Sequence, residues 1–297
     1  MRRHLILPAL CAIALIGAAP PSKPLTPSEI IAQAPASAWR NVDPENLMVI
    51  DLKNGKRVIV QLAPEFAPVH VANIKALAKA GWWTGAAVYR VQDNYVAQWG
   101  NNESEKPIPQ GVVEKPPAEY HRSLRGLTIH PLGSADAYAP RAGFALGWPV
   151  AYDPKAGTAN LPHCYASVGV GRGLSPDTGM GGELYAAIGH APRHLDRVIA
   201  VVGRVVEGID AFSSLPRGTE ALGFYKDRSS DVPIARVTLA ADIPATERPS
   251  FQYMDTQSAS FAAYVKGRAN RKDDFFIRPA GGVDLCNAPV PVRRTPK

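Results

Sequence analysis

The sequence predicts a mainly antiparallel β fold, a barrel or a sandwich, built from many short strands and two principal helices. Proline (28) and glycine (25) are frequent among the 297 residues, which disfavours a helical bundle. Apolar residues alternate over several short segments, as they do in half-buried strands. No heptad run or internal repeat is present, so coiled coils and solenoids are disfavoured. With 46% hydrophobic and 20% charged residues, the composition is that of a globular protein.

Residues 1–19 have the three parts of a secretory signal peptide. Arg2 and Arg3 give a positive start, an uncharged, largely apolar stretch runs from Leu5 to Ala19, and small residues lie at its end. The stretch is shorter than the roughly 20 residues of a membrane-spanning helix. We therefore expect an exported, periplasmic protein with no membrane contact beyond this signal; an uncleaved N-terminal anchor is the alternative.

The folded domain is expected to begin with a β hairpin. Residues 20–46 are rich in Pro, Ala and Ser and predict a tether, with a short helix near 28–34. Two apolar segments, 47–51 and 56–62, then flank Asn54-Gly55, which is a strong signal for a hairpin turn. These two segments are the first predicted strands.

A helix follows over residues 64–80. Val71, Ile74 and Ala78 fall on one helical face, and Gly81 is placed to end the helix. The barrel domain is expected to span 47–245, interrupted by an irregular, proline-rich insertion over about 102–165, with a C-terminal extension at 246–297 that packs on it. The other predicted elements are strands over 88–98, 183–188, 197–206 and 234–240, and helices over 208–215 and 258–269.

Motifs typical of several enzyme classes are absent. There is no phosphate-binding loop, His-Glu-x-x-His, nucleophile elbow or Cys-x-x-Cys. His190 and His194 have metal-ligand spacing, but Pro192 between them disfavours a regular helix, so neither a metal nor a cofactor is expected. The basic cluster within 266–272 is followed at once by two aspartates, which indicates a solvated helix face and no nucleic-acid partner.

Two cysteines, Cys164 and Cys286, remain beyond the signal segment. In an oxidising compartment such a pair suggests a disulfide. The alternative is two buried free thiols.

Residues 88–100 contain an unusual arrangement of polar residues in an apolar strand pattern. Arg90 interrupts the apolar positions, a bend follows at Asp93-Asn94, and Tyr95 and Gln98 come next. Taken alone, Arg90 reads as a surface strand residue and Gln98 as a buried amide that holds a turn.

The stretch resembles the cyclophilins, the peptidyl-prolyl cis/trans isomerases. Val-Tyr-Arg followed by Tyr-Val-Ala-Gln-Trp-Gly is similar to the family's Phe-His-Arg and Phe-Met-x-Gln-Gly-Gly at the same spacing. Further pieces resemble the family in the same order at 63–77, 181–188 and 195–208. The resemblance implies a closed antiparallel eight-stranded barrel capped by two helices, and isomerase activity on proline-containing polypeptides without a cofactor.

The resemblance also assigns roles to residues. It implies that Arg90 and Gln98 are catalytic. The residues it implies for substrate binding are Tyr95, Val96, Glu183, Leu184, Tyr185, Leu195 and Ile199. Six positions depart from the family pattern: Tyr89, Val96, Glu183, His194, Ile199 and the position near Gly169, where the family has a backbone-binding asparagine. Glu183 either pairs with Arg90 or faces water.

Prolyl isomerisation suits this residue set, because no bond is made or broken and no nucleophile is needed. A guanidinium is always charged and can donate a hydrogen bond to the nitrogen of a twisted amide. The departures in the pocket favour a second reading, in which the protein is a weakly active or inactive cyclophilin-like binding module or chaperone.

Overall fold

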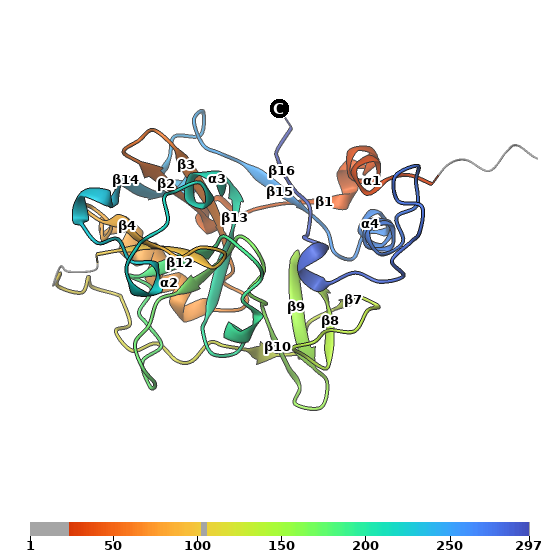
Figure 1. Ribbon diagram of the computed structural model, residues 1–297, viewed down its shortest axis with the longest axis horizontal. Coiled ribbons are helices and arrows are strands. Elements are labelled where there is room, and N and C mark those ends of the chain that lie inside the picture. The colour runs from red at the N-terminus through yellow and green to blue at the C-terminus, as the bar shows by residue number, and fades with distance from the viewer. Residues whose placement is uncertain (1–23, 102–105, 297) are drawn as a thin grey trace, which may run out of the picture.

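The computed structural model describes residues 24–101 and 106–296, and its centre is a closed barrel of eight antiparallel strands (Figure 1). The strand order is β11-β12-β5-β4-β14-β2-β3-β13, and pairing of β11 with β13 closes the barrel. The strands are β2 (Leu47–Leu52), β3 (Arg57–Leu62), β4 (Ala87–Val91), β5 (Val96–Gly100), β11 (Ser167–Val170), β12 (Leu184–Ala187), β13 (Val201–Glu207) and β14 (Val232–Leu239). The predicted mainly β, eight-stranded barrel is confirmed.

The β2–β3 hairpin has an almost continuous apolar sequence because both of its faces are buried. Met48 and Val60 point into the barrel core. Leu47, Val49 and Ile59 lie in a second cluster outside the barrel, together with residues of the C-terminal extension. Gly55 has a φ of 83° in the connecting turn, a conformation that glycine adopts without steric cost.

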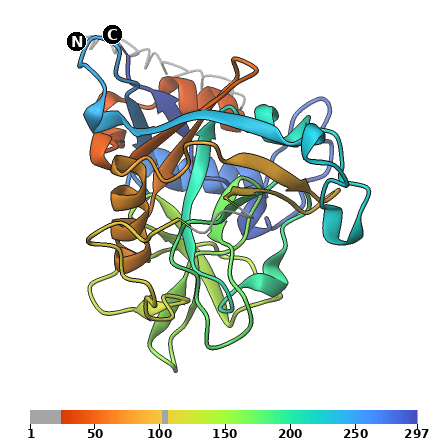
Figure 2. The same ribbon diagram turned by 90° about the vertical axis from the view of Figure 1, so that its left-hand side faces the viewer.

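The predicted strand over 88–98 is two strands, β4 and β5. Asn94, with a φ of 50°, lies in the turn between them, which is the bend that the sequence indicated. β4 pairs on its other side with β14, shown in light blue across the barrel in Figure 2.

Two helices belong to the barrel domain. Helix α2 (Pro68–Lys79) has a proline in its first turn, where no backbone donor is needed, and it buries Val71, Ile74 and Leu77 in the barrel core. Helix α3 (Asp210–Ser213) is a single turn whose Phe212 packs against Trp99, with ring centroids 5.0 Å apart.

The insertion is a second sheet, so the prediction of an irregular segment is wrong. Its five strands are ordered β6-β10-β9-β8-β7. They are β6 (Arg122–Ser123), β7 (His130–Pro131), β8 (Arg141–Ala145), β9 (Trp148–Asp153) and β10 (Thr158–Asn160). The turn between β8 and β9 has positive φ at both Leu146 and Gly147, and leucine is a poor turn signal. Trp148 and Val150 of this sheet pack with Phe66 and Val201 of the barrel domain.

The described part of 20–46 is folded, so the prediction of a tether is wrong there. Helix α1 (Pro27–Gln33) corresponds to the predicted short helix and contacts helix α4 (Ala259–Ala269). Strand β1 (Trp39–Asn41) pairs with β15 (Phe251–Met254), whose other neighbour is β16 (Val292–Arg294). The first and last described segments therefore form one three-stranded sheet.

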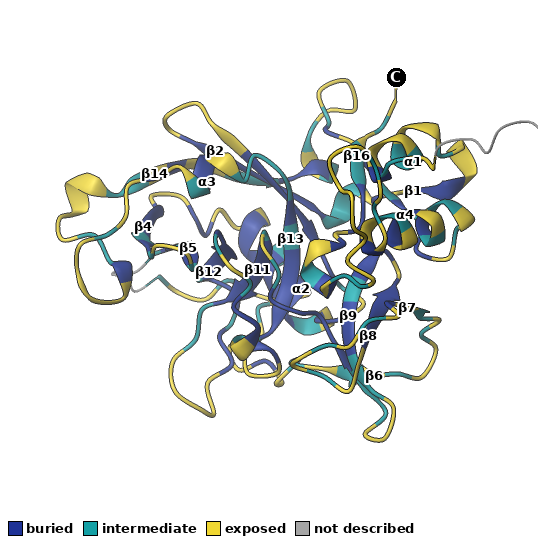
Figure 3. Cartoon of the chain, turned by 45° about the vertical axis from the view of Figure 1, so that its right-hand side comes forward, coloured by how far each residue is buried: buried dark blue, intermediate teal, exposed yellow. Residues whose placement is uncertain are grey.

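The C-terminal extension packs on both the barrel and the insertion. Phe251 contacts the outer face of β2 and β3. Phe261 of α4 and Leu285 lie in one buried cluster with Phe144 of the insertion. The blue core of Figure 3 accordingly continues from the barrel into the region of α1 and α4.

A disulfide joins Cys164, three residues before β11, to Cys286 in the extension. The predicted bridge is confirmed and the alternative of two free thiols is wrong. The expected signal peptide at 1–19 lies outside the described residues. Among the helices that are described, none has the length and apolar character needed to span a membrane.

Candidate active site

Arg90 and Gln98 lie side by side on the outer surface of the barrel. They are register partners across β4 and β5, at a point where a bulge follows Val88. Ala97 and Trp99 point into the core, so alternation along β5 places Gln98 on the opposite face. Arg90 Nη1 donates to Gln98 Oε1 at 2.8 Å.

The Arg90 guanidinium is held by two further acceptors. Its Nε donates to the Leu222 carbonyl at 2.7 Å, and its Nη2 donates to Gln92 Oε1 at 2.8 Å. The Phe224 ring lies 5.5 Å from the guanidinium carbon. Burial lowers the pKa of Arg90, yet an arginine stays protonated at physiological pH. Three of its five N–H groups are thus engaged in fixing its position.

Tyr89 connects Gln98 to Glu183. Gln98 Nε2 donates to the Tyr89 hydroxyl at 2.6 Å, and that hydroxyl donates to Glu183 Oε2 at 2.6 Å. Glu183 Oε1 also accepts from the Asn101 backbone N–H at 2.7 Å. Because a carboxylate only accepts, the tyrosine must donate to it, and its oxygen is left to accept from Gln98. This order turns the carbonyl oxygen of Gln98 toward Arg90.

Glu183 therefore neither pairs with Arg90 nor faces water, and both sequence-based alternatives are wrong. Its carboxylate is packed over Gly100, where a Cβ would overlap it. Burial raises the pKa of Glu183, and the bond from Tyr89 partly offsets this rise. Burial also raises the pKa of Tyr89 far above its usual value, which keeps the hydroxyl protonated as a donor.

Two tyrosines lie next to the arginine–glutamine pair. Tyr185 is the register partner of Gln98 across β12 and β5. Tyr95 is stacked on His194, with ring centroids 5.9 Å apart and planes within 6° of parallel. Burial raises the pKa of both phenols, and the charge of Arg90 lowers it by a smaller amount. Both rings therefore lie close enough to the guanidinium to interact with its charge.

Tyr185 is fixed from behind by a buried histidine. Its hydroxyl lies 2.9 Å from His163 Nε2, and it packs over Gly169, where any Cβ would overlap the phenol ring. His163 Nδ1 lies 3.1 Å from Asp196 Oδ1. Only 4% of the Tyr185 surface is exposed, so the ring offers a narrow edge to the site.

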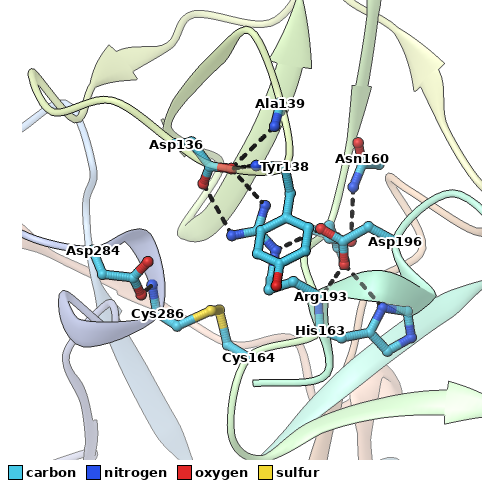
Figure 4. A network of polar contacts seen from close by, with 11 residues as sticks. Asp136, Tyr138, Ala139, Asn160, His163, Cys164, Arg193, Asp196, Asp284 and Cys286 are labelled. Atoms are coloured by element: carbon cyan, nitrogen blue, oxygen red, sulfur yellow. Dashed lines mark hydrogen bonds and ion pairs between the residues drawn. A yellow bond between two sulfur atoms is a disulfide. The ribbon is translucent and has the colours of Figure 1, made fainter. Parts of the chain in front are cut away.

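The chain of contacts behind Tyr185 continues into the insertion (Figure 4). Arg193 Nε donates to Asp196 Oδ2 at 2.6 Å, and its two terminal nitrogens donate to Asp136 at 2.9 and 3.1 Å. Burial raises the pKa of Asp136, but the bonds and charge of Arg193, together with the backbone N–H groups of Tyr138 and Ala139, outweigh it and the net pKa is lowered. Sequence reasoning missed His163, Arg193 and Asp136; the Arg193–Asp196 spacing was the only local signal.

The remaining predicted substrate-binding residues differ in where they lie. Leu184 is fully buried in the barrel core, so its prediction as a binding residue is wrong. Strand β12 alternates, and Tyr185 takes the outward position beside it. Val96 is 1% exposed, next to the turn. Leu195 and Ile199 are half-buried, around the 3₁₀ turn that holds His194, and their binding role stays a prediction.

No group of three or more His, Cys, Asp or Glu side chains within 24–101 and 106–296 is arranged to hold a metal ion.

The eight-stranded barrel thus carries Arg90 and Gln98 on its outer face, next to two tyrosines. The family model described as cyclophilin type peptidyl-prolyl cis-trans isomerase/CLD matches residues 47–239. The chain belongs to this family and is a cyclophilin-type peptidyl-prolyl cis-trans isomerase.

Relatives of known name agree with this assignment. A probable peptidyl-prolyl cis-trans isomerase of Brucella suis is 28% identical over 179 residues, covering 60% of this chain and 76% of that protein. A protein of the same name from Brucella abortus matches to the same extent. In fold, the chain is similar to the crystal structure of cyclophilin AquaCyp293 from Hirschia baltica, with a TM-score of 0.68 and 24% identity, covering 86% of this chain and 93% of that one.

Proposed function

We propose that this isomerase turns Xaa-Pro bonds in exported polypeptides and so assists their folding in the periplasm, with Arg90 as the residue that contacts the turning amide. The observation that carries the proposal is the position of the Arg90 guanidinium, fixed by Gln98 on the outer face of the barrel beside Tyr95 and Tyr185.

The chemistry follows from the electronic structure of the peptide bond. Resonance holds the bond planar with a barrier of about 18–20 kcal/mol, and rotation returns a lone pair to the prolyl nitrogen. A guanidinium N–H placed at that nitrogen stabilises the twisted state and leaves the planar ground state unaffected. Arg90 has two N–H groups beyond the three that bind Leu222, Gln92 and Gln98. One preorganised donor supplies about 3–4 kcal/mol, or a few hundredfold in rate.

The walls of the site supply the second contribution. A twisted amide is less dipolar than a planar one, so an apolar surface favours it. Tyr95 and Leu195 are half-buried and offer most of this surface, since Val96 and Tyr185 are almost fully buried. Gln98, with its carbonyl oxygen taken by Arg90, acts as a positioning residue.

Export to the periplasm is supported by two independent features. Residues 1–19 have the pattern of a secretory signal, and the Cys164–Cys286 disulfide is of a kind that persists in oxidising compartments. Fractionation of the source cells followed by intact-mass measurement tests this. We expect a periplasmic protein that lacks the first residues; a cytoplasmic protein with an intact N-terminus would refute it.

The catalytic role is tested with a protease-coupled isomerisation assay on Xaa-Pro peptides. We expect Arg90→Ala to lower kcat/KM by roughly a few hundredfold, the value of one preorganised donor. Arg236→Ala is the matched control, because Arg236 is an exposed arginine of β14 that pairs with Asp51. Equal kcat/KM for wild type and Arg90→Ala would overturn the role of Arg90.

A binding module is the second candidate function, and the departures of the site from the family pattern at Val96, Glu183 and Ile199 favour it. In that case wild type and Arg90→Ala both leave the isomerisation rate at its uncatalysed value while an Xaa-Pro peptide still binds. Titration with the same peptides, read by tyrosine and tryptophan fluorescence, separates this outcome from catalysis.

A further inference from the structure

A pocket separate from the isomerase site lies where the barrel, the insertion and the C-terminal extension meet. Its volume is about 240 Å³, and its lining includes both cysteines of the disulfide, Trp148 of β9 and Arg204 of β13. Arg90 and Gln98 are not among the lining residues. Three segments that are far apart in the sequence thus build one cavity.

The polar part of the pocket is formed by Ser167 and Arg204 on adjacent strands, and Gln61 lies behind Arg204. Arg204 of β13 is the register partner of Ser167 on β11 and of Gln61 on β3. Directly opposed residues in antiparallel strands carry their side chains on the same face, about 4.5–5.5 Å apart at Cβ. Ser167 and Arg204 both line the cavity.

Arg204 is a half-buried cation without an acidic partner among the described residues. Its Nε and Nη2 both donate to Gln61 Oε1, at 3.1 and 2.8 Å, and the Trp148 ring lies 4.4 Å from the guanidinium carbon. Within the described residues, no carboxylate forms an ion pair with it or offsets its burial, and burial lowers its pKa to about 9. A charge that is partly withdrawn from water is normally paired, because leaving it unpaired is costly.

Ser167 adds an unused polar atom at the same place. Its hydroxyl is buried and has no hydrogen-bond partner among the described atoms, and the residue is 5% exposed. Buried hydroxyls are nearly always bonded, so an orphan beside an unpaired arginine indicates an acceptor that binds both.

The rest of the lining is apolar, so the part of the ligand that contacts it should be apolar as well. It consists mainly of Leu161, Val201, Val205, Leu285, Val290 and Val292. The volume is below the 300–1,000 Å³ typical of sites for drug-sized ligands, so the occupant is small. One cation and one hydroxyl match a monoanion better than a phosphate dianion.

We propose that this pocket binds a small carboxylate with an apolar chain, of the size of a medium-chain fatty acid. The carboxylate accepts from the free N–H groups of Arg204 and from the Ser167 hydroxyl, and the chain lies against the valines and leucines. The proposal does not depend on isomerase activity.

The test is calorimetric titration of the full oxidised protein with octanoate. We expect octanoate to bind and to raise the melting temperature, because a ligand of the native state stabilises it. Octanol, which has the same chain without the charge, and inorganic phosphate, which has charge without the chain, are each expected to bind at least about tenfold more weakly.

Variants locate the site. We expect Arg204→Met to weaken octanoate binding at least about tenfold, the minimum for loss of one partner of a buried charge pair. Ser167→Ala should weaken it a few fold, and Arg236→Met, which removes an equal charge from an exposed position, should leave it unchanged. The Trp148 indole N–H signal in NMR spectra of wild type should shift with octanoate, which keeps the test valid if Arg204→Met fails to fold.

Three results would each overturn the proposal. The first is that octanoate does not bind to wild type. The second is that octanol or phosphate binds as tightly as octanoate. The third is that octanoate binds without shifting the Trp148 signal, or binds equally well to Arg204→Met.

Discussion

Replacement of Tyr89 by phenylalanine tests the order of hydrogen bonds that orients the catalytic arginine. The change removes one oxygen atom and keeps the ring, which stacks on Phe224 at a centroid distance of 5.9 Å. Gln98 then loses its acceptor and Glu183 loses one of its donors. The Gln98 amide is free to turn over, and its oxygen no longer has to face Arg90.

The size of the effect follows from the bonds involved. Loss of one positioning hydrogen bond is worth about 1–2 kcal/mol, which corresponds to a roughly five- to thirtyfold lower kcat/KM. This is a smaller loss than we expect for Arg90→Ala. The pKa of Glu183 should rise further, because burial raises it and the bond from Tyr89 is the largest effect that lowers it.

Two readouts separate positioning from simple damage to the fold. kcat/KM is measured with the protease-coupled assay, and the Glu183 carboxyl is titrated by NMR. Tyr264→Phe is the matched control, since its hydroxyl donates to the Pro289 carbonyl at 2.9 Å in the extension. A folded Tyr89→Phe protein with wild-type kcat/KM, or with an unshifted Glu183 pKa, would refute the reasoning.

Two further predictions concern the contacts that connect the extension and the insertion to the barrel. Reduction of the Cys164–Cys286 bridge, which spans 122 residues, should lower the free energy of unfolding by about 4–5 kcal/mol in the chain-entropy model; an unchanged urea midpoint would contradict this. For Asp136, burial raises the pKa, but the bonds and charge of Arg193 and two backbone N–H groups together outweigh it, so the folded-state pKa is lowered. Its contribution to stability is therefore present above the unfolded pKa near 3.9 and is lost as the pH falls through the folded value. Urea unfolding of wild type and Asp136→Asn should show a gap in stability at neutral pH that closes in acid; a constant gap would argue against the ion pair.

The pairing of Arg90 with Gln98 could be anticipated from the sequence because it is local. A bend at positions 93 and 94 folds the segment back on itself, and the register of β4 and β5 then brings position 90 opposite position 98. The wrong prediction of Leu184 as a binding residue also has a cause that lies within its own strand. Outward positions on a strand recur every second residue, so Tyr185 and Leu184 cannot both face the substrate.

The parts of the site that could not be predicted depend on contacts between distant segments. Tyr89 meets Glu183 across 94 positions, and Arg193 meets Asp136 across 57. No local pattern marks such pairs, because each partner alone resembles an ordinary strand or loop residue. The same holds for β1, a three-residue strand that is stable only through its pairing with β15.

The sheet of β1, β15 and β16 has a consequence for how the molecule matures. A ribosome makes β16 long after the barrel strands, and β1 pairs only with β15, the middle strand of that sheet. Strand β1 therefore has no partner strand until residues 251–254 have been made. Until then, Trp39 and the outer face of the β2–β3 hairpin lack the residues of the C-terminal extension that cover them in the folded protein.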